Sequence, residues 1–333
     1  MKILVVFTGG TIGSGVSSDG YIKTDDNRKY ELIDMYEKRR SDDVSFSVVC
    51  PYMLLSENLD AKYINKLSEC VALNIDKDYD GIIIAHGTDT LQYSAAAVSY
   101  ALGNRCRPVV FVSSDYILSD SRQNGTDNFY YAVKFICQRG GSGVFAVSTN
   151  RGGKPEIHRG TRLLRHSEYS NRIESVFYQN YGHFENDIFI KNERYEEIED
   201  EAEPFGVLKC RDECFVQMIV PYPNFCYPLA GEKTKAVLHL SYHSGTVCTA
   251  SSELKTFCAD LKRRNIPVFL AGSTDKNAYE STNQYEDLMF KILPPSAAAA
   301  MYMKIWIILS HGADIQNIYK SIGGDIKSRA ENV

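Results

Sequence analysis

The sequence of 333 residues lacks an apolar run of the roughly 20 residues that a membrane-spanning helix needs. Its best candidate, Met301 to Leu309, is short and is interrupted by Lys304. The first apolar run, Ile3 to Phe7, is too short for the core of a signal peptide and leads directly into a glycine-rich turn. We therefore expect a cytoplasmic protein with no membrane partner.

Clusters of positive charge are missing as well. The chain has 37 lysine and arginine residues against 42 aspartate and glutamate residues, and its net charge is -5. Proteins that bind nucleic acid or a membrane surface through bulk charge carry a concentrated basic patch. The composition therefore argues against both kinds of partner.

The nine cysteines form no Cys-x-x-Cys motif, and their only close pair is Cys210 and Cys214. Several lie inside apolar segments, among them Cys50, Cys106 and Cys137, where a thiol behaves as a small hydrophobic side chain. We expect no structural disulfide, no metal site and no cofactor.

The most informative segment of the sequence runs from Asp80 to Thr90. Ile82 to Ala85 has the composition of a buried strand, His-Gly then breaks it, and Leu91 to Leu102 has the pattern of a helix. This order places Thr88 and Asp89 at the carboxyl edge of a parallel sheet, where open α/β sheets bind ligands. The free N–H groups of the helix start favour anionic groups. Taken alone, Thr-Asp at a helix start is usually only a cap.

A similar arrangement begins the chain. Lys2 to Phe7 is predicted to be a strand, and Thr8-Gly9-Gly10-Thr11-Ile12-Gly13 is predicted to be its turn. Glycine-rich turns after a first strand commonly bind phosphates or dinucleotides, but no Gly-x-Gly-x-x-Gly or Gly-Lys-Ser/Thr motif follows here. Two hydroxyl-bearing turns on parallel strands can face one pocket.

The rest of the chain alternates between strand and helix patterns, which predicts an α/β fold with a doubly wound parallel sheet. We expect a larger domain over residues 1–191, an acidic, solvated linker over 192–212, and a smaller α/β domain over 213–333. Lys154 to Arg165 is expected to leave the first sheet as an exposed ribbon, and Gly15 to Tyr30 has the composition of a mobile loop beside a site. The pattern predicts further helices near 31–40, 60–74, 127–138 and 252–264 and from about 295 and 313, and further strands near 44–50, 107–112, 143–147, 215–220, 236–240 and 268–271.

Together, Thr-Gly-Gly-Thr-Ile-Gly near the start and His86-Gly87-Thr88-Asp89-Thr90 resemble the bacterial-type L-asparaginases (asparaginase/glutaminase family). The resemblance implies a larger N-terminal and a smaller C-terminal α/β domain. It implies hydrolysis of L-asparagine to L-aspartate and ammonia. It also implies a homo-oligomer, a dimer or tetramer, in which the second domain of one subunit completes the site of its neighbour.

The same resemblance implies roles for residues of the two turns and of the loop after the first. Thr11 is the implied nucleophile, which becomes acylated, and Thr88 and Asp89 match the second threonine and the aspartate of the family. Tyr21 matches the lid tyrosine, with Tyr30 as its rival. Backbone N–H groups around Thr88 are candidates for stabilising the oxyanion.

Substrate recognition follows from the two charges of an amino acid. By resemblance, Asp89 holds the ammonium, Ser56 binds the α-carboxylate, and Glu57 lies where family members carry a residue that helps to bind the amino group. Ser114 falls where the family uses a backbone carbonyl. We interpret His86 and Thr90 as packing and capping residues.

Two departures from the family pattern bear on the mechanism. Leu164-Arg165 stands where the family has Thr-Lys, and Ser244 stands where some members place an asparagine from the neighbouring subunit. An arginine stays protonated and cannot act as a base, but it can hold Asp89 ionised. Alternatively, Arg165 lies on the solvent side of its ribbon. Tyr279-Glu280 is the nearest match to the acidic residue that reaches the partner's lid tyrosine.

The sequence leaves three functions open. The leading one is an L-asparagine amidohydrolase, whose preference for asparagine over glutamine the sequence does not decide. The second is an amide-donor subunit of a tRNA-dependent amidotransferase, which would need more RNA-facing surface than this acidic chain offers. The third is an amino-acid binding or sensing protein, for which Leu164 and Arg165 are the motive.

Overall fold

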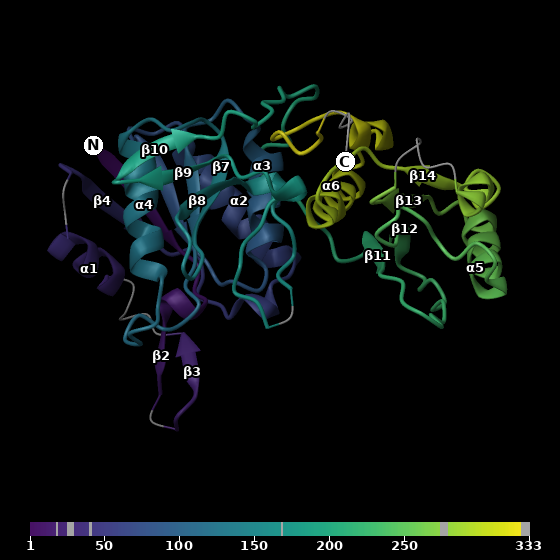
Figure 1. Cartoon of the computed structure of the whole chain (residues 1–333), viewed down its shortest axis with the longest axis horizontal. Helices are drawn as coiled ribbons and strands as arrows, with labels where there is room; N and C mark the ends of the chain where they lie inside the picture. The colour runs from purple at the N-terminus through teal and green to yellow at the C-terminus, as the bar shows by residue number, and fades with distance from the viewer. Residues whose placement is uncertain (18, 25–29, 40–41, 168, 274–278, 328–333) are drawn as a thin grey trace.

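A computed structural model describes residues 1–17, 19–24, 30–39, 42–167, 169–273 and 279–327. It has two large sheets, one of eight strands and one of four, each covered by helices, and a small sheet of two strands (Figure 1). The parallel strands dominate both sheets, so the predicted fold of a larger and a smaller α/β domain is confirmed. Parts of three predictions, Arg40, residues 25–29 of the loop and residues 328–333 of the second domain, lie outside the described residues.

The larger sheet has the strand order β10-β9-β8-β7-β6-β5-β1-β4. In its parallel part Phe7 pairs with Ala85, and Ala85 pairs with Val112. Three neighbouring strands therefore end level with one another, and the turns that follow them meet at one edge. The strands are β1 (Lys2–Phe7), β4 (Ser45–Val49), β5 (Gly81–Ala85), β6 (Val109–Val112), β7 (Val144–Thr149), β8 (Pro155–Arg159), β9 (Gly182–Glu185) and β10 (Ile188–Lys191).

Helices cover both faces of this sheet, which makes it doubly wound. Alternate residues of β1 point to opposite faces: Val5 packs in the core under α1 (Glu31–Arg39) and α4 (Gly125–Cys137), and Leu4 packs under α2 (Ala61–Ile75) and α3 (Leu91–Leu102). The side chain of Asp60 accepts a hydrogen bond from the N–H of Tyr63 and caps α2.

The smaller sheet is fully parallel. It consists of β11 (Phe215–Ile219), β12 (Thr234–Leu240), β13 (Val268–Ala271) and β14 (Phe290–Ile292). Helix α5 (Ser252–Arg263) packs on one face and α6 (Ala298–His311) on the other, and α6 also packs against α3 of the first domain. The helix predicted from residue 313 is only a short 3-10 turn, Ile315–Tyr319.

The expectation of an exposed ribbon over 154–165 is wrong. Residues 155–159 form β8, which pairs antiparallel with β7, and Ile157, His158 and Arg159 are buried. The charge of Arg159 is accommodated because its guanidinium donates to the Ser142 carbonyl (2.8 Å) and stacks on the Phe145 ring (4.4 Å). These partners come from other parts of the chain, so the local sequence resembled a solvent-exposed segment.

Residues 192–212 join the two sheets without a helix or strand, but they are not a solvated tether. The carboxylate of Asp200 accepts hydrogen bonds from the backbone N–H groups of Asn104 and Gly323, both at 2.7 Å, and Glu201 accepts one from Ser321 at 2.9 Å. Leu208 is buried. Asp200 and Glu201 therefore fasten this segment to both domains. The exact domain boundaries stay a prediction.

Lys304, the charge that interrupts the last apolar run, lies in the seam between the domains. Its ammonium is buried 2.8 Å from the carboxylate of Asp325, which also accepts a hydrogen bond from the Tyr100 hydroxyl at 3.0 Å. Within the described ranges, no helix combines the length and the apolar character needed to cross a membrane.

Two hairpins were not predicted from the sequence. One, β9–β10, closes the edge of the larger sheet. The other, β2 (Ser14–Val16) with β3 (Ile22–Thr24), follows the first turn and projects away from the body of the domain (Figure 1).

Candidate active site

Three loops interlock at the carboxyl edge of the larger sheet. The hydroxyl of Thr8, in the turn after β1, donates to the carbonyl of Ala85 at the end of β5 (2.9 Å). In the loop after β4, the N–H of Leu54 donates to the Thr8 carbonyl (3.0 Å), and the Leu54 carbonyl accepts from the N–H of Gly10 (2.8 Å). The first turn is therefore held between its two neighbours by backbone hydrogen bonds.

The two glycines of the first turn have steric reasons to be glycine. Gly10 has a φ of 73°, and a Cβ atom there would lie 2.2 Å from the Cα of Gly87. Gly9 has a φ of 102°, and its Cβ would lie 2.3 Å from the Leu54 carbonyl oxygen. Both positions combine a backbone conformation that favours glycine with direct backbone contact. The glycines thus allow the turn that carries Thr11 to lie directly against the turn that carries Thr88.

The turn after β5 carries the acidic group of the site. Asp89 is exposed, and its carboxylate accepts a hydrogen bond from the buried hydroxyl of Ser56 (3.2 Å). Thr90 occupies the N-cap position of α3, but its hydroxyl makes no capping bond and donates to the Ser56 carbonyl (3.0 Å). The interpretation of Thr90 as a cap is therefore corrected: its side chain ties two loops together.

His86 is a packing residue, as predicted. The ring is buried, lies 2.8 Å through Nδ1 from the Gly87 carbonyl, and packs edge-on against Phe111. Burial lowers the pKa of His86 to about 4, so the ring is neutral at physiological pH.

A polar hollow of about 230 Å³ opens beside the second turn. Besides Thr88 and Asp89, the hollow is lined by Asp115 from the loop after β6 and by four residues of the irregular segment that follows β8. The sequence did not identify these additional residues, although Asp115 follows directly on a strand of the same edge, which is a usable signal. The lining consists of Thr88, Asp89, Asp115, His166, Ser167, Ser170 and Asn171.

Thr11 and the two candidates for the lid tyrosine do not line this hollow. Thr11 is half-buried in the short 3-10 turn Thr11–Gly13. Tyr21 is 69% exposed on the projecting hairpin, and Tyr30 is 51% exposed at the start of α1. The structure therefore brings neither tyrosine to the hollow.

The expected binding residues differ in what their side chains do. Glu57 is exposed beside Ser56. The hydroxyl of Ser114 donates to the Tyr116 carbonyl (2.6 Å) and accepts from the N–H of Gly125 (3.1 Å), so this side chain holds the start of α4. Its neighbour Asp115 is the one that lines the hollow.

Arg165 is exposed and lines a different hollow, of about 500 Å³, between the two domains. Thr90, Tyr93, Tyr302 and Trp306 are among the residues that share it. Across the part of the chain that the structure describes, Arg165 makes no hydrogen bond or ion pair. The expected contact between its guanidinium and Asp89 is not formed in this arrangement.

The residues expected to serve a neighbouring subunit lie in the second domain. Ser244 follows β12, where its hydroxyl lies 2.8 Å from that of Thr246. Tyr279 is 53% exposed, and Glu280 begins the 3-10 turn Glu280–Gln284. Figure 1 shows this domain at the right, whereas the β2–β3 hairpin projects from the lower side of the first domain.

Comparison with known families decides the relationship. The model of the family described as "Asparaginase, N-terminal" matches residues 2–196, which is more than half of the chain and includes the turns that carry Thr11 and Thr88. The chain belongs to the asparaginase family. This confirms the resemblance seen in the two threonine motifs.

Individual asparaginase-family relatives match to different extents. A glutamyl-tRNA(Gln) amidotransferase subunit from Methanobrevibacter smithii is 26% identical over 341 residues, which cover 98% of this chain and 76% of that protein. L-asparaginase 1 of Escherichia coli is 35% identical over 166 residues, about half of each chain (49% and 47%). The structure of the thermostable L-asparaginase from Thermococcus kodakarensis has a TM-score of 0.80 at 23% identity and covers 99% of this chain and 100% of that one, which shows the shared fold.

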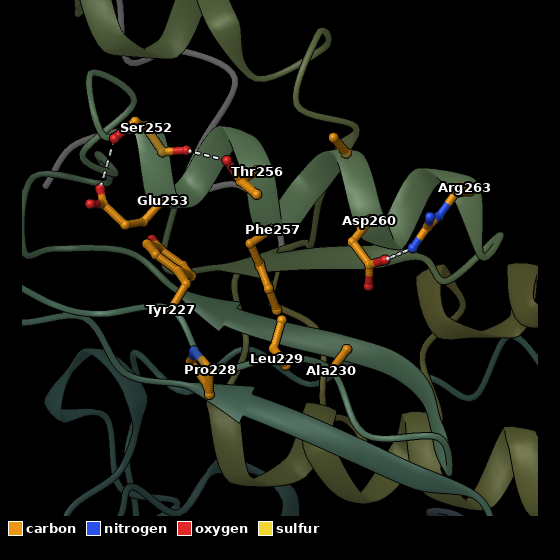
Figure 2. Close-up of a pocket in the computed structure, with 11 residues that line it drawn as sticks. Tyr227, Pro228, Leu229, Ala230, Ser252, Glu253, Thr256, Phe257, Asp260 and Arg263 are labelled. Atoms are coloured by element: carbon orange, nitrogen blue, oxygen red, sulfur yellow. Dashed lines mark hydrogen bonds and ion pairs between the residues drawn. The ribbon is translucent and has the colours of Figure 1, made fainter.

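Another hollow, of about 680 Å³, lies on the second domain of this asparaginase-family chain, between the loop Tyr227–Ala230 and α5 (Figure 2). Its polar groups are engaged along the helix: the Thr256 hydroxyl donates to the Ser252 carbonyl (2.9 Å), and Asp260 and Arg263 form an ion pair (2.6 Å). Because these polar groups are bonded to one another along α5, they are not free to bind a ligand together, and the groove is not the candidate site despite its larger volume.

The described residues contain no group of three or more histidine, cysteine, aspartate or glutamate side chains arranged so that they could hold a metal ion together. All nine cysteines are free thiols.

Proposed function

We propose that the protein hydrolyses L-asparagine to L-aspartate and ammonia through a threonine nucleophile and an acyl-enzyme. The observation that carries this proposal is the close contact between the Gly10 turn and the Gly87 turn, which brings the turn that carries Thr11 against the turn that carries Thr88 and Asp89. Membership of the asparaginase family and the relatives named L-asparaginase support the same reaction.

In the proposed reaction Thr11 attacks the side-chain amide carbon, and N–H groups around Thr88 stabilise the oxyanion. Asp89 holds the substrate ammonium, and the hydrogen bond from Ser56 fixes the direction of that carboxylate. Ser56 and Glu57 complete the recognition of the amino-acid end, and the Ser114 backbone carbonyl faces the amide. Tyr21 acts as the lid tyrosine once the β2–β3 hairpin folds over the site.

Arg165 has a conditional part in this proposal. Its side chain is exposed and lacks a partner among the described residues, so it is able to turn toward Asp89 without breaking an existing ion pair. In that position its positive charge stabilises the Asp89 carboxylate that holds the substrate ammonium. It cannot exchange a proton as a lysine would.

The active unit is proposed to be at least a C2 dimer. Tyr21 is 69% exposed, and Ser244 and Glu280 lie in the other domain. We therefore propose that residues of a neighbouring subunit complete the site around Tyr21. Light scattering at the assay concentration should report a dimer or tetramer, whereas a fully active monomer would contradict this part of the proposal. A cytoplasmic location stays a prediction from the sequence.

The function is tested by ammonia release from the purified protein with L-asparagine, L-glutamine and D-asparagine as separate substrates. We expect release from L-asparagine, and the comparison with L-glutamine measures the preference that the sequence leaves open. Tight binding of L-asparagine without any ammonia release would favour the sensing function instead.

The match to the amidotransferase subunit favours one further candidate, an amide donor that acts with a partner on charged tRNA. The discriminating observation is turnover without partners. Ammonia release from free L-asparagine by the chain alone supports the hydrolase, whereas release that requires a partner subunit and glutamyl-tRNA supports the amide donor.

A further inference from the structure

The seven histidines of the chain are not equivalent as proton carriers. His86, His158 and His239 are buried, and burial lowers the pKa of each to about 4. Each also has a fixed neighbour: the Gly87 carbonyl, the Ser175 hydroxyl (2.8 Å) and the Tyr227 hydroxyl (2.9 Å), respectively. These three rings stay neutral and cannot exchange protons with a ligand near neutral pH.

His166 is placed differently. It is half-buried and lines the 230 Å³ hollow together with Thr88 and Asp89, although it comes from a separate segment that follows β8. Arg165, the residue before it, faces the other hollow between the domains. His166 is therefore the histidine that reaches both the candidate site and solvent.

Asp115 supplies a fixed negative charge in the same hollow. Its carboxylate accepts a hydrogen bond from the Asn124 side chain (3.1 Å), and its own N–H donates to the Asn124 carbonyl oxygen (2.9 Å). Burial raises the pKa of Asp115, while a hydrogen bond from Asn171 and the charge of His166 act in the opposite direction. The Asn124 side chain thus fixes the position of the carboxylate, and His166 is near enough to act on it electrostatically.

Building on the amidohydrolase function proposed above, we propose that His166 donates the proton that the departing ammonia needs, and that Asp115, which lines the same hollow, is a positioning residue for His166. Histidine is the side chain most often used for this task. Asp89 and Asp115 are the acidic groups that line the hollow with His166.

The proton balance of the two half-reactions closes. Thr11 Oγ bonds to the amide carbon, and its proton passes through the hydroxyl of Tyr21, the proposed lid residue, to a water molecule that returns it when the acyl-enzyme is hydrolysed. The C–N bond then breaks, and the nitrogen takes a proton from the His166 imidazolium, so that ammonia leaves as a neutral molecule. In the second half-reaction the neutral imidazole takes a proton from the attacking water. The acyl–Oγ bond breaks, and Thr11 recovers its proton.

A substrate that needs no proton on its leaving group separates this role from a structural one. The 4-nitrophenyl β-ester of L-aspartate acylates the same nucleophile, but its leaving group departs as a stable anion. We expect His166→Gln to lower the acylation rate with L-asparagine on the order of a hundredfold, and to change the release of 4-nitrophenolate from the ester in the pre-steady-state burst less than about threefold. Asp115→Asn should show the same selectivity to a smaller degree.

The matched control is His183→Gln, which removes a histidine beside Glu185 on the far edge of the sheet (3.2 Å) and should alter neither substrate. Equal losses with both substrates, or no loss with either, would overturn the role of His166. A wild-type protein that cleaves the ester but not the amide also overturns it, while leaving Thr11 as the nucleophile. A wild-type protein that cleaves neither refutes the proposed function itself and the proton donor with it.

Discussion

The two hollows on the two domains differ in a way that volume alone does not reveal. The groove beside α5 holds about 680 Å³, nearly three times the 230 Å³ of the hollow beside Thr88 (Figure 2). Yet the charged groups of the groove beside α5, such as Asp260 and Arg263, are paired with each other along a single helix. The smaller hollow is built by three segments that are far apart in the sequence, and two carboxylates and an imidazole face into it.

This difference follows from the register of the larger sheet. Because β5 and β6 end level, Thr88 and Asp89 after β5 and Asp115 after β6 come together in the hollow, and glycines at 10 and 87 let the turn after β1 lie against the turn after β5. A helix beside a loop, as in the groove, offers no such convergence. Side chains from separate elements that point to one place are the better indicator of a site.

The threonines give the largest expected contrast between the two regions. Thr11→Val and Thr88→Val should each fold normally and lose turnover by about a thousandfold or more, as expected for members of a nucleophilic unit. Thr256→Val makes the same change in the groove, where the hydroxyl binds only its own helix, and should leave turnover unchanged. Near wild-type ammonia release from both site variants would remove the assignment of either threonine as nucleophile.

The glycine turns give the next contrast, in stability rather than activity. Gly10 and Gly152 have almost the same φ, 73° and 74°. A Cβ at Gly10 would overlap the backbone of Gly87, whereas a Cβ at Gly152 would have no atom within 4 Å among those described. Gly152→Ala should cost about 1 kcal/mol in unfolding free energy from the backbone conformation alone. Gly10→Ala should cost at least ~3 kcal/mol, measured by urea unfolding. Equal costs would show that the interlocked turns are not tightly packed.

Arg165 gives a smaller effect that tests its conditional role. If it serves as the charge partner of Asp89, Arg165→Ala should lower kcat/KM about tenfold, the size of one charge interaction near the surface, and Arg165→Lys should keep or raise it. Arg263→Ala in the groove removes an arginine that is 80% exposed and should have no effect. Unchanged turnover in Arg165→Ala would show that Arg165 does not act as the charge partner of Asp89 and that its side chain points to solvent.

Two serines give the smallest contrast. Ser56→Ala removes the hydrogen bond to Asp89 and should raise KM several-fold with little change in kcat. Ser251→Ala removes the N-cap of α5, whose side chain accepts from the N–H of Leu254, and should cost about 1 kcal/mol of stability without changing KM. The kinetic constants and the unfolding curves of both variants check the pair.

The sequence predicted those features whose causes are local. Helix α3 has the predicted bounds, Leu91–Leu102, because a turn precedes it and a glycine follows it. The two glycine turns were recognisable because close backbone approach requires glycine at fixed spacing. They were enough to identify the family.

Features that depend on distant partners could not be predicted in this way. Strand β8 looked exposed because Arg159 is accommodated by Ser142, Phe145 and Glu197. The same holds for the site. Ser56 and Asp89 were both expected and do meet, but His166 reaches the hollow from an irregular segment whose path only the folded chain determines.

The most direct test of the central claim is to identify the acylated residue during turnover. We would mix the protein with L-asparagine, quench with acid within one turnover, and map peptides by mass spectrometry, with Thr11→Val as the control. We expect one β-aspartyl group on the peptide that contains Thr11 and none in the control. Ammonia release with the adduct on another residue, or with no adduct at Thr11, would contradict it.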